Sequence, residues 1–596
     1  MAKNKTIGSF SFIFHSHLPY VRKAGVWPFG EEWLHEALSE TYIPLLDVFY
    51  NLIDEGIKPQ ATVGITPILA EQLNDPYLSE KFQKYMEIKI RKCEEDIERN
   101  LSNPKLRDLA IFYLDFFNEI LSSYKNRYNS DVIGAFKKLQ DEGFIEIITC
   151  AATHGYLPLL GRDSAVNAQI KVGIESYKRL FRREPKGIWL PECAYRHGYE
   201  WIPPVEGEYA QRGYRPGIEK FLIENNIKYF IVDAHTIEGG KTMGVYTLRF
   251  PALQKLYQQS VREYKDIEVD EPKTTFSPYL LKHNEDFIAI VGRNEKAGLQ
   301  VWSGDRGYPG DGWYREFHKK DSISGLQYWR VTGGDVDLGS KVLYEPDMVA
   351  GRVQENSDHF VHMIYSLLKD FKDKTGKNGI VAAPYDSELF GHWWFEGPKW
   401  IKQVLKKMAK MEELDLTTIS DHLEKFTPEI TIRIPESSWG EGGHHWVWLN
   451  QDTYWIWPHI YESEKKMEDL AKKYKDTDDD FIKRVLNQAA RELLLLESSD
   501  WPFLITTWQA RDYASNRFSE HLDNFNNLIN AVEKAGAVEK AGAVEKTSAV
   551  EETSAVEETS AVEYRKKDKE FRKYLESIEE KDKIFPNIDF TIYAKY

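Results

Sequence analysis

Short apolar runs alternate with long amphipathic stretches over the first 400 residues of the chain. Seven of these runs have the length and the content of β-branched and aromatic residues expected of buried strands. They span residues 9–15, 62–66, 144–150, 187–192, 228–235, 287–292 and 379–386. Most of the stretches between them are rich in Leu, Lys and Glu and predict helices. Alternating strands and helices form βαβ units, so we predict an α/β fold whose parallel sheet is a barrel or barrel-like.

Several segments depart from this alternation. Residues 78–130 read as two amphipathic helices without a strand, which predicts a helical insertion between two barrel segments, 1–77 and 131–400. Residues 247–285 are polar and irregular, so we expect an excursion there. Strand signals nearly vanish beyond residue 400, which predicts a C-terminal helical domain over 401–596.

A hexapeptide repeat occupies residues 531–563 of this C-terminal region. Six residues turn a helix through about 600°, so the valines of the repeat point in three directions and cannot bury one continuous face. We therefore expect a solvated helix or a flexible low-complexity insert.

Composition narrows the possible partners. The chain has 78 Lys and Arg against 94 Asp and Glu, a net charge of −16, which disfavours nucleic acid and anionic membranes as main partners. We find no signal-peptide pattern and no apolar stretch long enough to span a bilayer. The three cysteines, Cys93, Cys150 and Cys193, are widely separated and form neither a disulfide framework nor a zinc ribbon. We expect a cytoplasmic protein, and its oligomeric state does not follow from the sequence.

Polar residues with catalytic potential stand at or just beyond the ends of the predicted strands. The active site of a parallel barrel lies at the carboxyl ends of its strands. The residues at these ends are His15, His154, Glu192, Asp233, His235 and Asp386. We therefore predict an active site at this end of the sheet.

Glu192 and Asp386 each end a buried run and are each followed by aromatic residues. A pair of carboxyl groups can cut or transfer a glycosidic bond. In a retaining enzyme one group attacks the anomeric carbon and the other protonates the leaving oxygen, at a separation of about 5–5.5 Å. Carboxylates at strand ends also bind metals or cap helices, so this pairing alone leaves the chemistry open.

His15 and His17 form a second candidate group. Alternate residues of a strand share one face, so a His-x-His pair can bind one metal ion. A metal-dependent hydrolase or deacetylase is therefore an alternative from another class. Histidines at the mouth of a barrel can also hydrogen-bond the hydroxyl groups of a sugar, which is the interpretation we favour.

Tryptophan supplies the third candidate group. Many of the 17 Trp residues lie beside Gly, Ser and charged residues rather than in apolar runs. A half-exposed indole offers a flat apolar face with a polar edge, which suits a sugar ring. The best candidates for such a platform are Trp33, Trp302, Trp439 and Trp448.

Five ordered segments resemble the signature regions of glycoside hydrolase family 57, and most closely those of its 1,4-α-glucan branching enzyme group. They are FHSHLPY (14–20), IEIITCAATHGYLPLL (145–160), GIWLPECAY (187–195), APYDSELFGHWWFEGP (383–398) and SSDWPFLITT (498–507). The resemblance spans nearly the whole chain. It implies a distorted (β/α)7 barrel with a helical insertion and a C-terminal helical domain.

The resemblance also implies a retaining mechanism on α-glucans such as amylose, amylopectin and glycogen, without a metal or another cofactor. By the motif match, Glu192 is the nucleophile and Asp386 the general acid/base. Contacts to the substrate are implied for His15, His17, His154, Trp33, Arg293, Trp302, Trp439, Trp448 and Asp500.

One segment departs from the pattern of the branching group. Members of that group carry a mobile loop after the fifth strand, with a tyrosine that shields the intermediate. The corresponding residues 234–246 are short, and their only tyrosine, Tyr246, belongs to the motif that follows. A short loop favours attack by water, so an α-amylase-type hydrolase with the same carboxyl pair is the alternative within this class.

Overall fold

The computed structural model describes residues 6–240, 266–302, 307–545 and 569–596. All seven predicted strands form. Each contributes to a single sheet, in which seven parallel strands of the described chain follow one another. In sheet order they are β10 (Gly379–Asp386), β1 (Gly8–Ser16), β2 (Ala61–Ile65), β3 (Ile145–Cys150), β4 (Gly187–Trp189), β7 (Tyr229–Val232) and β9 (Asp286–Gly292).

The first and last of the seven described parallel strands, β10 and β9, approach each other without pairing, as expected of a distorted barrel. Strand β8 (Tyr279–His283) adds antiparallel to the outer edge of β9, and β11 (Leu414–Leu416) adds parallel to β1. Within the described residues no strand ladder joins β9 to β10. The seam is bridged instead just after β9, where the Asn294 amide donates to the Ala382 carbonyl at 3.0 Å.

The two faces of β1 show why its sequence folds this way. All nine of its residues are buried, as is typical of a parallel strand covered on both faces. Phe12 packs on the aromatic rings of Phe360 and Trp400 in the outer helices. Ile13 points to the other side and joins an inner cluster with residues of the neighbouring strands. His15 shares this inner face because side chains alternate along a strand.

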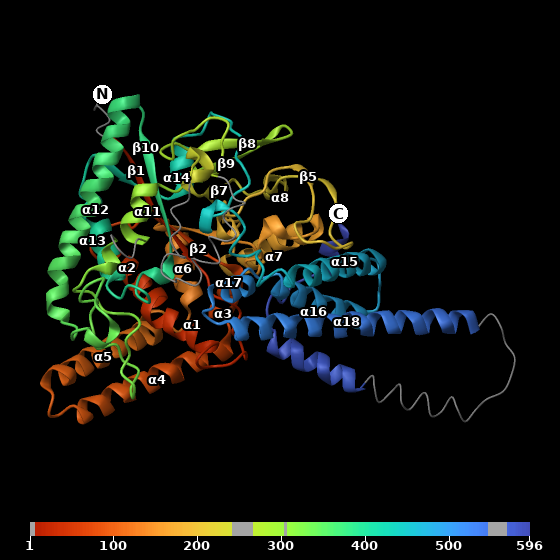
Figure 1. Ribbon diagram of the computed structural model, residues 1–596, viewed down its shortest axis with the longest axis horizontal. Coiled ribbons are helices and arrows are strands. Elements are labelled where there is room, and N and C mark those ends of the chain that lie inside the picture. The colour runs from red at the N-terminus through yellow and green to blue at the C-terminus, as the bar shows by residue number, and fades with distance from the viewer. Residues whose placement is uncertain (1–5, 241–265, 303–306, 546–568) are drawn as a thin grey trace.

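Helices connect the strands and cover the outer face of the sheet (Figure 1). They are α1 (Glu31–Ala37), α2 (Ile43–Asp54), α3 (Pro67–Leu73), α6 (Val132–Asp141), α7 (Asp163–Phe181), α8 (Ile218–Glu224), α9 (Ala234–Glu238), α11 (Glu295–Trp302), α12 (Pro346–Thr375) and α13 (Gly397–Met408). A further helix, α14 (Ile419–Lys425), packs on the inner cluster through Ile419. A short hairpin, β5 (Tyr199–Trp201) and β6 (Gly213–Arg215), lies outside the main sheet.

The predicted insertion is a pair of long helices, α4 (Pro76–Arg99) and α5 (Pro104–Ser122), which lie side by side at the lower left of Figure 1. Asp75 and Asn103 cap them by accepting hydrogen bonds from backbone amides of the first turn. Of the predicted excursion over 247–285, residues 247–265 lie outside the described residues. The described part includes β8, a strand that its polar flanks concealed.

The C-terminal region is helical, with α15 (Ile456–Tyr474), α16 (Asp480–Leu496), α17 (Asp500–Thr507), α18 (Arg511–Glu545) and a final helix over 569–581. Before them, α13 still packs on α2 and α12, and β11 still joins the sheet. The division of the chain into domains therefore stays a prediction. The first part of the hexapeptide repeat, to Glu545, continues α18, whereas residues 546–563 lie outside the described residues. No described helix combines the length and apolar content needed to cross a bilayer.

Candidate active site

The carboxyl ends of the parallel strands bring the predicted residues of distant segments together. His15 at the end of β1 stands in register with Asp386 at the end of β10. Glu192 follows β4, and its negative charge is close enough to raise the pKa of Asp386. Both carboxyl side chains are partly exposed, whereas His15 and His154 beside them are buried. The two carboxyl groups are therefore the reachable acids of this end of the barrel.

Glu192 has a left-handed backbone conformation, with φ 60° and ψ 25°. A residue with a side chain rarely adopts it, at a cost of about 1–3 kcal/mol, and such strain gathers at functional sites. The neighbouring chain holds it in place: the Trp439 amide donates to the Glu192 carbonyl at 3.0 Å, and the Trp439 indole donates to Oε2 at 2.6 Å. Ser499 Oγ lies 3.4 Å from the other carboxylate oxygen. One segment thus fixes both the backbone and the carboxylate of Glu192.

Opposing effects set the pKa of Glu192. Burial raises it to about 7, while the hydrogen bond from Trp439, the charge of His17 and the contact with Ser499 favour the ionised form. Glu192 is therefore present in part as a carboxylate near neutral pH.

Asp386 lies in a different environment. Burial and the negative charges of Glu388 and Glu192 raise its pKa well above the ordinary value, and Arg293 offsets this only in part. These effects favour the protonated form of Asp386. Two neighbouring carboxyl groups in surroundings that act differently on their pKa values are the usual arrangement of an acid and a nucleophile.

Three imidazole rings pack beside Glu192. His15 Nε2 and His154 Nε2 lie 3.1 Å apart, and His154 Nδ1 lies 2.8 Å from Ser499 Oγ. His154 stacks on His17 with ring centroids 3.9 Å apart. Burial lowers the pKa of His15 and His154 well below the ordinary value, and the charge of His17 adds to this. Both rings are thus neutral, and each can donate one hydrogen bond and accept another.

His17 is the ring of this group whose pKa is raised. Burial opposes protonation, but the charge of Asp500 and a hydrogen bond between His17 Nε2 and Asp500 Oδ1, 3.0 Å long, raise the pKa above its ordinary value. The other ring nitrogen lies 3.1 Å from Thr66 Oγ1. The predicted residues His17 and Asp500 are therefore partners that border the carboxyl pair.

Arg293 lies at the strand ends but is bound to Asp233. Its guanidinium donates to both Asp233 oxygens, at 2.8 and 2.6 Å. Burial raises the pKa of Asp233, yet the charge of Arg293 outweighs burial and leaves the pKa below its ordinary value. The guanidinium carbon also lies 6.0 Å from the centroid of the Trp439 ring. Arg293 is placed to hold Trp439 and to add positive charge beside Asp386.

The four predicted tryptophans have different positions. Trp439 contacts Glu192 directly. Trp33 packs on Tyr513, with ring centroids 5.4 Å apart. Tyr513 in turn lies near Asp500: burial raises the pKa of Tyr513 to about 12, and the negative charge of Asp500 contributes to the rise. Trp33 therefore lies on the Asp500 side of the site.

Trp302 and Trp448 lie in apolar packing instead. Trp302 ends α11 and packs against the cluster outside the sheet. Trp448 is 1% exposed and stacks on Tyr156 with ring centroids 4.3 Å apart. Its ring faces are covered by protein, so in this structure it offers no surface to a sugar.

The metal-dependent alternative gains no support from this geometry. The ring nitrogens of His17 contact Thr66 and Asp500, and Nε2 of His15 contacts His154. Among the residues that the structure describes, one group of three side chains brings possible ligand atoms within 4.8 Å of one another, namely Glu492, His521 and Asp582, in the C-terminal region. The alternative stays a prediction that a chelator would test.

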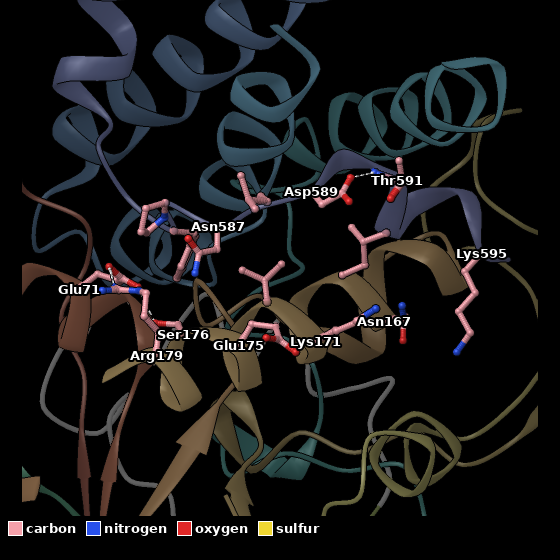
Figure 2. Close-up of a pocket in the computed structure, with 15 residues that line it drawn as sticks. Glu71, Asn167, Lys171, Glu175, Ser176, Arg179, Asn587, Asp589, Thr591 and Lys595 are labelled. Atoms are coloured by element: carbon pink, nitrogen blue, oxygen red, sulfur yellow. Dashed lines mark hydrogen bonds and ion pairs between the residues drawn. The ribbon is translucent and has the colours of Figure 1, made fainter. Parts of the chain in front are cut away.

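A cavity of about 510 Å³ lies elsewhere, between α7 and the C-terminal segment (Figure 2). Its lining contains neither carboxyl group of the pair and none of the other predicted site residues. On its wall Arg179 already forms an ion pair with Glu71. We therefore place the chemistry at the strand ends.

Sequence reasoning missed three residues that complete the site. Ser499 contacts both Glu192 and His154, and Glu388 accepts hydrogen bonds from the Tyr42 hydroxyl and the His17 amide. Ser499 precedes Asp500, and Glu388 lies two residues after Asp386, both within segments that resemble the family. Their place in these segments could have identified them. Tyr42 carried no signal because its helix lies far away in the sequence.

Comparison with known proteins places the chain among the glycoside hydrolases. The family model of glycosyl hydrolase family 57 matches residues 11–435, and that of the C-terminal domain of 1,4-alpha-glucan branching enzymes matches residues 459–553. The chain belongs to glycosyl hydrolase family 57.

Relatives with names and solved structures agree with this assignment. The chain is 46% identical over 527 residues to a 1,4-alpha-glucan branching enzyme of Thermococcus kodakarensis, a match that covers 88% of this chain and 74% of the relative. It resembles the crystal structure of a family 57 branching enzyme from Pyrococcus horikoshii, with a TM-score of 0.82, 42% identity and coverage of 99% and 97%. It also resembles the α-amylase AmyC of Thermotoga maritima, with a TM-score of 0.77, 30% identity and coverage of 99% of each chain.

Proposed function

We propose that this chain is a 1,4-α-glucan branching enzyme, which cleaves α-1,4 bonds and forms α-1,6 branches with retention of configuration. The observation that carries the proposal is the contrast between the two carboxyl groups. Glu192 accepts a hydrogen bond from the Trp439 indole at 2.6 Å, whereas Asp386 faces the negative charges of Glu388 and Glu192. The hydrogen bond favours the carboxylate form of Glu192 against its burial, whereas the neighbouring negative charges add to burial and favour the acid form of Asp386.

In the first step, Glu192 attacks C1 of an α-1,4-linked glucose unit. Asp386 gives its proton to the glycosidic oxygen, and the bond from C1 to that oxygen breaks. The part of the glucan that carries this oxygen leaves as an alcohol. The neutral His15 and His154 are placed to bind hydroxyl groups of the sugar whose C1 reacts. The product is a covalent glycosyl-enzyme on Glu192.

In the second step, Asp386 is a carboxylate and acts as a base. It takes the proton of a 6-hydroxyl group on an acceptor glucan, and that oxygen attacks C1 and displaces Glu192. Two inversions at C1 retain the α configuration. The proposed substrates are amylose, amylopectin and glycogen, all of which contain α-1,4 bonds.

Hydrolysis is the second candidate function. If water replaces the acceptor hydroxyl, the same carboxyl pair makes an α-amylase. The resemblance to the Thermotoga maritima α-amylase and the short segment 234–246 support this candidate, although residues 241–246 lie outside the described residues. The higher identity to a named branching enzyme and the match to the branching enzyme C-terminal domain support transfer as the main activity.

The two candidates can be separated on amylose without added metal. Iodine staining and reducing ends are followed together, and the product is then treated with an enzyme that cleaves α-1,6 bonds. A branching enzyme loses iodine colour with few new reducing ends, and new chains appear only after debranching. Reducing ends that rise in step with the loss of colour would instead assign hydrolysis.

The roles of the carboxyl pair are tested by Glu192→Gln and Asp386→Asn. Each substitution keeps the shape of the side chain and removes the charge or the acid, so we expect turnover to fall by about 10³-fold or more with the melting temperature retained. The matched control is Glu219→Gln, because Glu219 is a buried carboxyl group that binds the Tyr195 hydroxyl. Near-normal turnover in either pair variant would refute its assigned role.

A further inference from the structure

Trp508 is an exposed tryptophan in an unusual conformation at the end of α17. Its backbone is left-handed, with φ 59° and ψ 12°, and 57% of its surface is exposed. Helices that end in this conformation normally place Gly or Asn there, because a bulky side chain is disfavoured. Neither the core nor the backbone therefore accounts for a tryptophan at this position.

Polar neighbours hold the indole ring from its edge and from one side. Its Nε1 donates to Asp452 Oδ2 at 3.4 Å, and Arg511 pairs with the same carboxylate oxygen at 3.4 Å. The guanidinium carbon of Arg511 lies 5.2 Å from the centroid of the ring. These contacts orient the ring, while 57% of the surface of the residue stays open to solvent.

Two segments connect Trp508 to Glu192. α17 packs on α18 (Figure 1) and follows directly on Ser499, which contacts Glu192. Asp452 belongs to the loop that continues from Trp439, and Asn450 in that loop donates to Thr506 Oγ1 at 2.8 Å. The eight residues of α17 span about 12 Å, so Trp508 lies farther from Glu192 than the sugar that reacts.

We propose that Trp508 is a binding platform for a glucose unit of the α-glucan chain, distant from the bond that is cleaved. A flat indole face suits the apolar side of a pyranose ring, and Asp452 and Arg511 at its border can bind sugar hydroxyls. Charged groups beside the ring disfavour an apolar partner. The inference rests on the proposed function, because it takes an α-glucan as the ligand.

The test compares Trp508→Ala, Trp508→Gly and Trp508→Phe in the full chain. Binding is measured by retardation of the protein in native gels that contain amylose, and KM and kcat are measured with amylose. We expect Trp508→Ala to weaken amylose binding about 5- to 10-fold and to raise KM similarly, with kcat within twofold. Trp508→Phe retains most of the binding because it keeps an aromatic face.

Trp508→Gly separates binding from stability. Glycine adopts the left-handed conformation without strain, so this variant has a melting temperature no lower than that of Trp508→Ala and yet binds amylose equally poorly. The matched control is Tyr214→Ala, which removes an aromatic ring that is 64% exposed on the β5–β6 hairpin and leaves amylose binding unchanged.

Three results would overturn the platform. The first is amylose binding by Trp508→Ala and Trp508→Gly that equals that of the wild type. The second is an equal loss of binding in Tyr214→Ala. The third is a loss of binding in Trp508→Phe as large as that in Trp508→Ala. A wild-type chain that neither binds nor converts amylose would overturn the proposed function together with the platform. Conversion by the wild type with unchanged binding in the variants would overturn the platform alone.

Discussion

At the scale of single residues, the site depends on how Glu192 is held. Its position directly after an apolar run made it a candidate in the sequence, but its usefulness as a nucleophile depends on groups that neutralise the cost of burying a charge. The Trp439 indole is foremost among them, since it donates to Oε2 at 2.6 Å. Ser499, just before α17, and His17, just after β1, act on the same carboxylate.

The dependence of activity on pH follows from this arrangement. Glu192 must be ionised and Asp386 protonated, so kcat/KM falls at low pH as Glu192 gains a proton, around its pKa of about 7, and falls at high pH as Asp386 loses one. Trp439→Phe removes a donor that stabilises the carboxylate, so the pKa of Glu192 rises. We expect the acidic limb of the profile to move upward by about one pH unit.

The profile of kcat/KM against pH on a soluble α-glucan checks this expectation. Trp448→Phe is the matched control, because Trp448 is a buried tryptophan whose indole nitrogen has no hydrogen-bond partner among the described residues. Its acidic limb should stay in place. An unmoved limb in Trp439→Phe would contradict the role that we give to the indole.

At the scale of elements, a single glutamine braces the two segments that carry His154 and Ser499. Gln169 on α7 is fully buried. Its amide accepts a hydrogen bond from the Thr153 backbone at 3.1 Å and donates to Thr153 Oγ1 and to Glu497 Oε2, both at 2.8 Å. Thr153 precedes His154, and Glu497 lies two residues before Ser499. The brace therefore sets the distance between the two segments that converge on Glu192.

Gln169→Met tests the brace with a side chain of similar size. The substitution leaves the Thr153 amide and the Glu497 carboxyl group buried without their partner, at about 1–3 kcal/mol for each. We expect the free energy of unfolding to fall by about 2–5 kcal/mol, together with a lower kcat, as measured by urea unfolding and initial rates.

The control for this experiment is Gln354→Met on α12, where the amide contacts the exposed Asp358. We expect its free energy of unfolding to change by less than about 0.5 kcal/mol. Equal free energies of unfolding for Gln169→Met and the wild type would show that these hydrogen bonds do not stabilise the fold.

At the scale of the whole molecule, the C-terminal segment, residues 569–596, packs on α16 and α18 through a buried cluster of ionisable side chains. Asp582 and Glu492 are both buried, and burial raises the pKa of each to about 7. His521 joins Glu492 to Arg517, at 2.8 Å on each side, and Lys581 adds positive charge at the border. The segment also covers Tyr20, so it ties the end of the chain to its beginning.

This cluster makes the stability of the protein depend on pH. The pKa of Asp582 is higher in the folded protein than its ordinary value of 3.8, so the folded state binds the proton more tightly than the unfolded state. The stabilisation that comes from the protonated Asp582 is fully present below pH 4 and is lost as the pH rises to about 7. Each unit of the pKa shift corresponds to about 1.4 kcal/mol.

Asp582→Asn keeps the shape of the neutral acid and cannot ionise. We expect it to flatten the fall in the melting temperature between pH 5 and 8 and to be more stable than the wild type at pH 8. The exposed Asp589→Asn serves as the control and keeps the slope of the wild type. A wild-type slope in Asp582→Asn would contradict the assignment of the titration to this group.

Local patterns in the sequence determined the seven strands, the two helices of the insertion, the helical C-terminal region and the strand-end positions of Glu192 and Asp386. They could do so because apolar periodicity reports which face of an element is buried. The family resemblance assigned the same two carboxyl groups a role, which stays a proposal.

The tertiary structure alone decided which residues meet. Ser499, Glu388 and Tyr42 complete the site because separate segments converge there, and Trp448 is removed from it because Tyr156 covers its ring. The protonation states of Glu192 and Asp386 likewise depend on burial and on charges from other strands. These are contacts over long sequence separations, and the order of residues along a chain does not encode the distances between them.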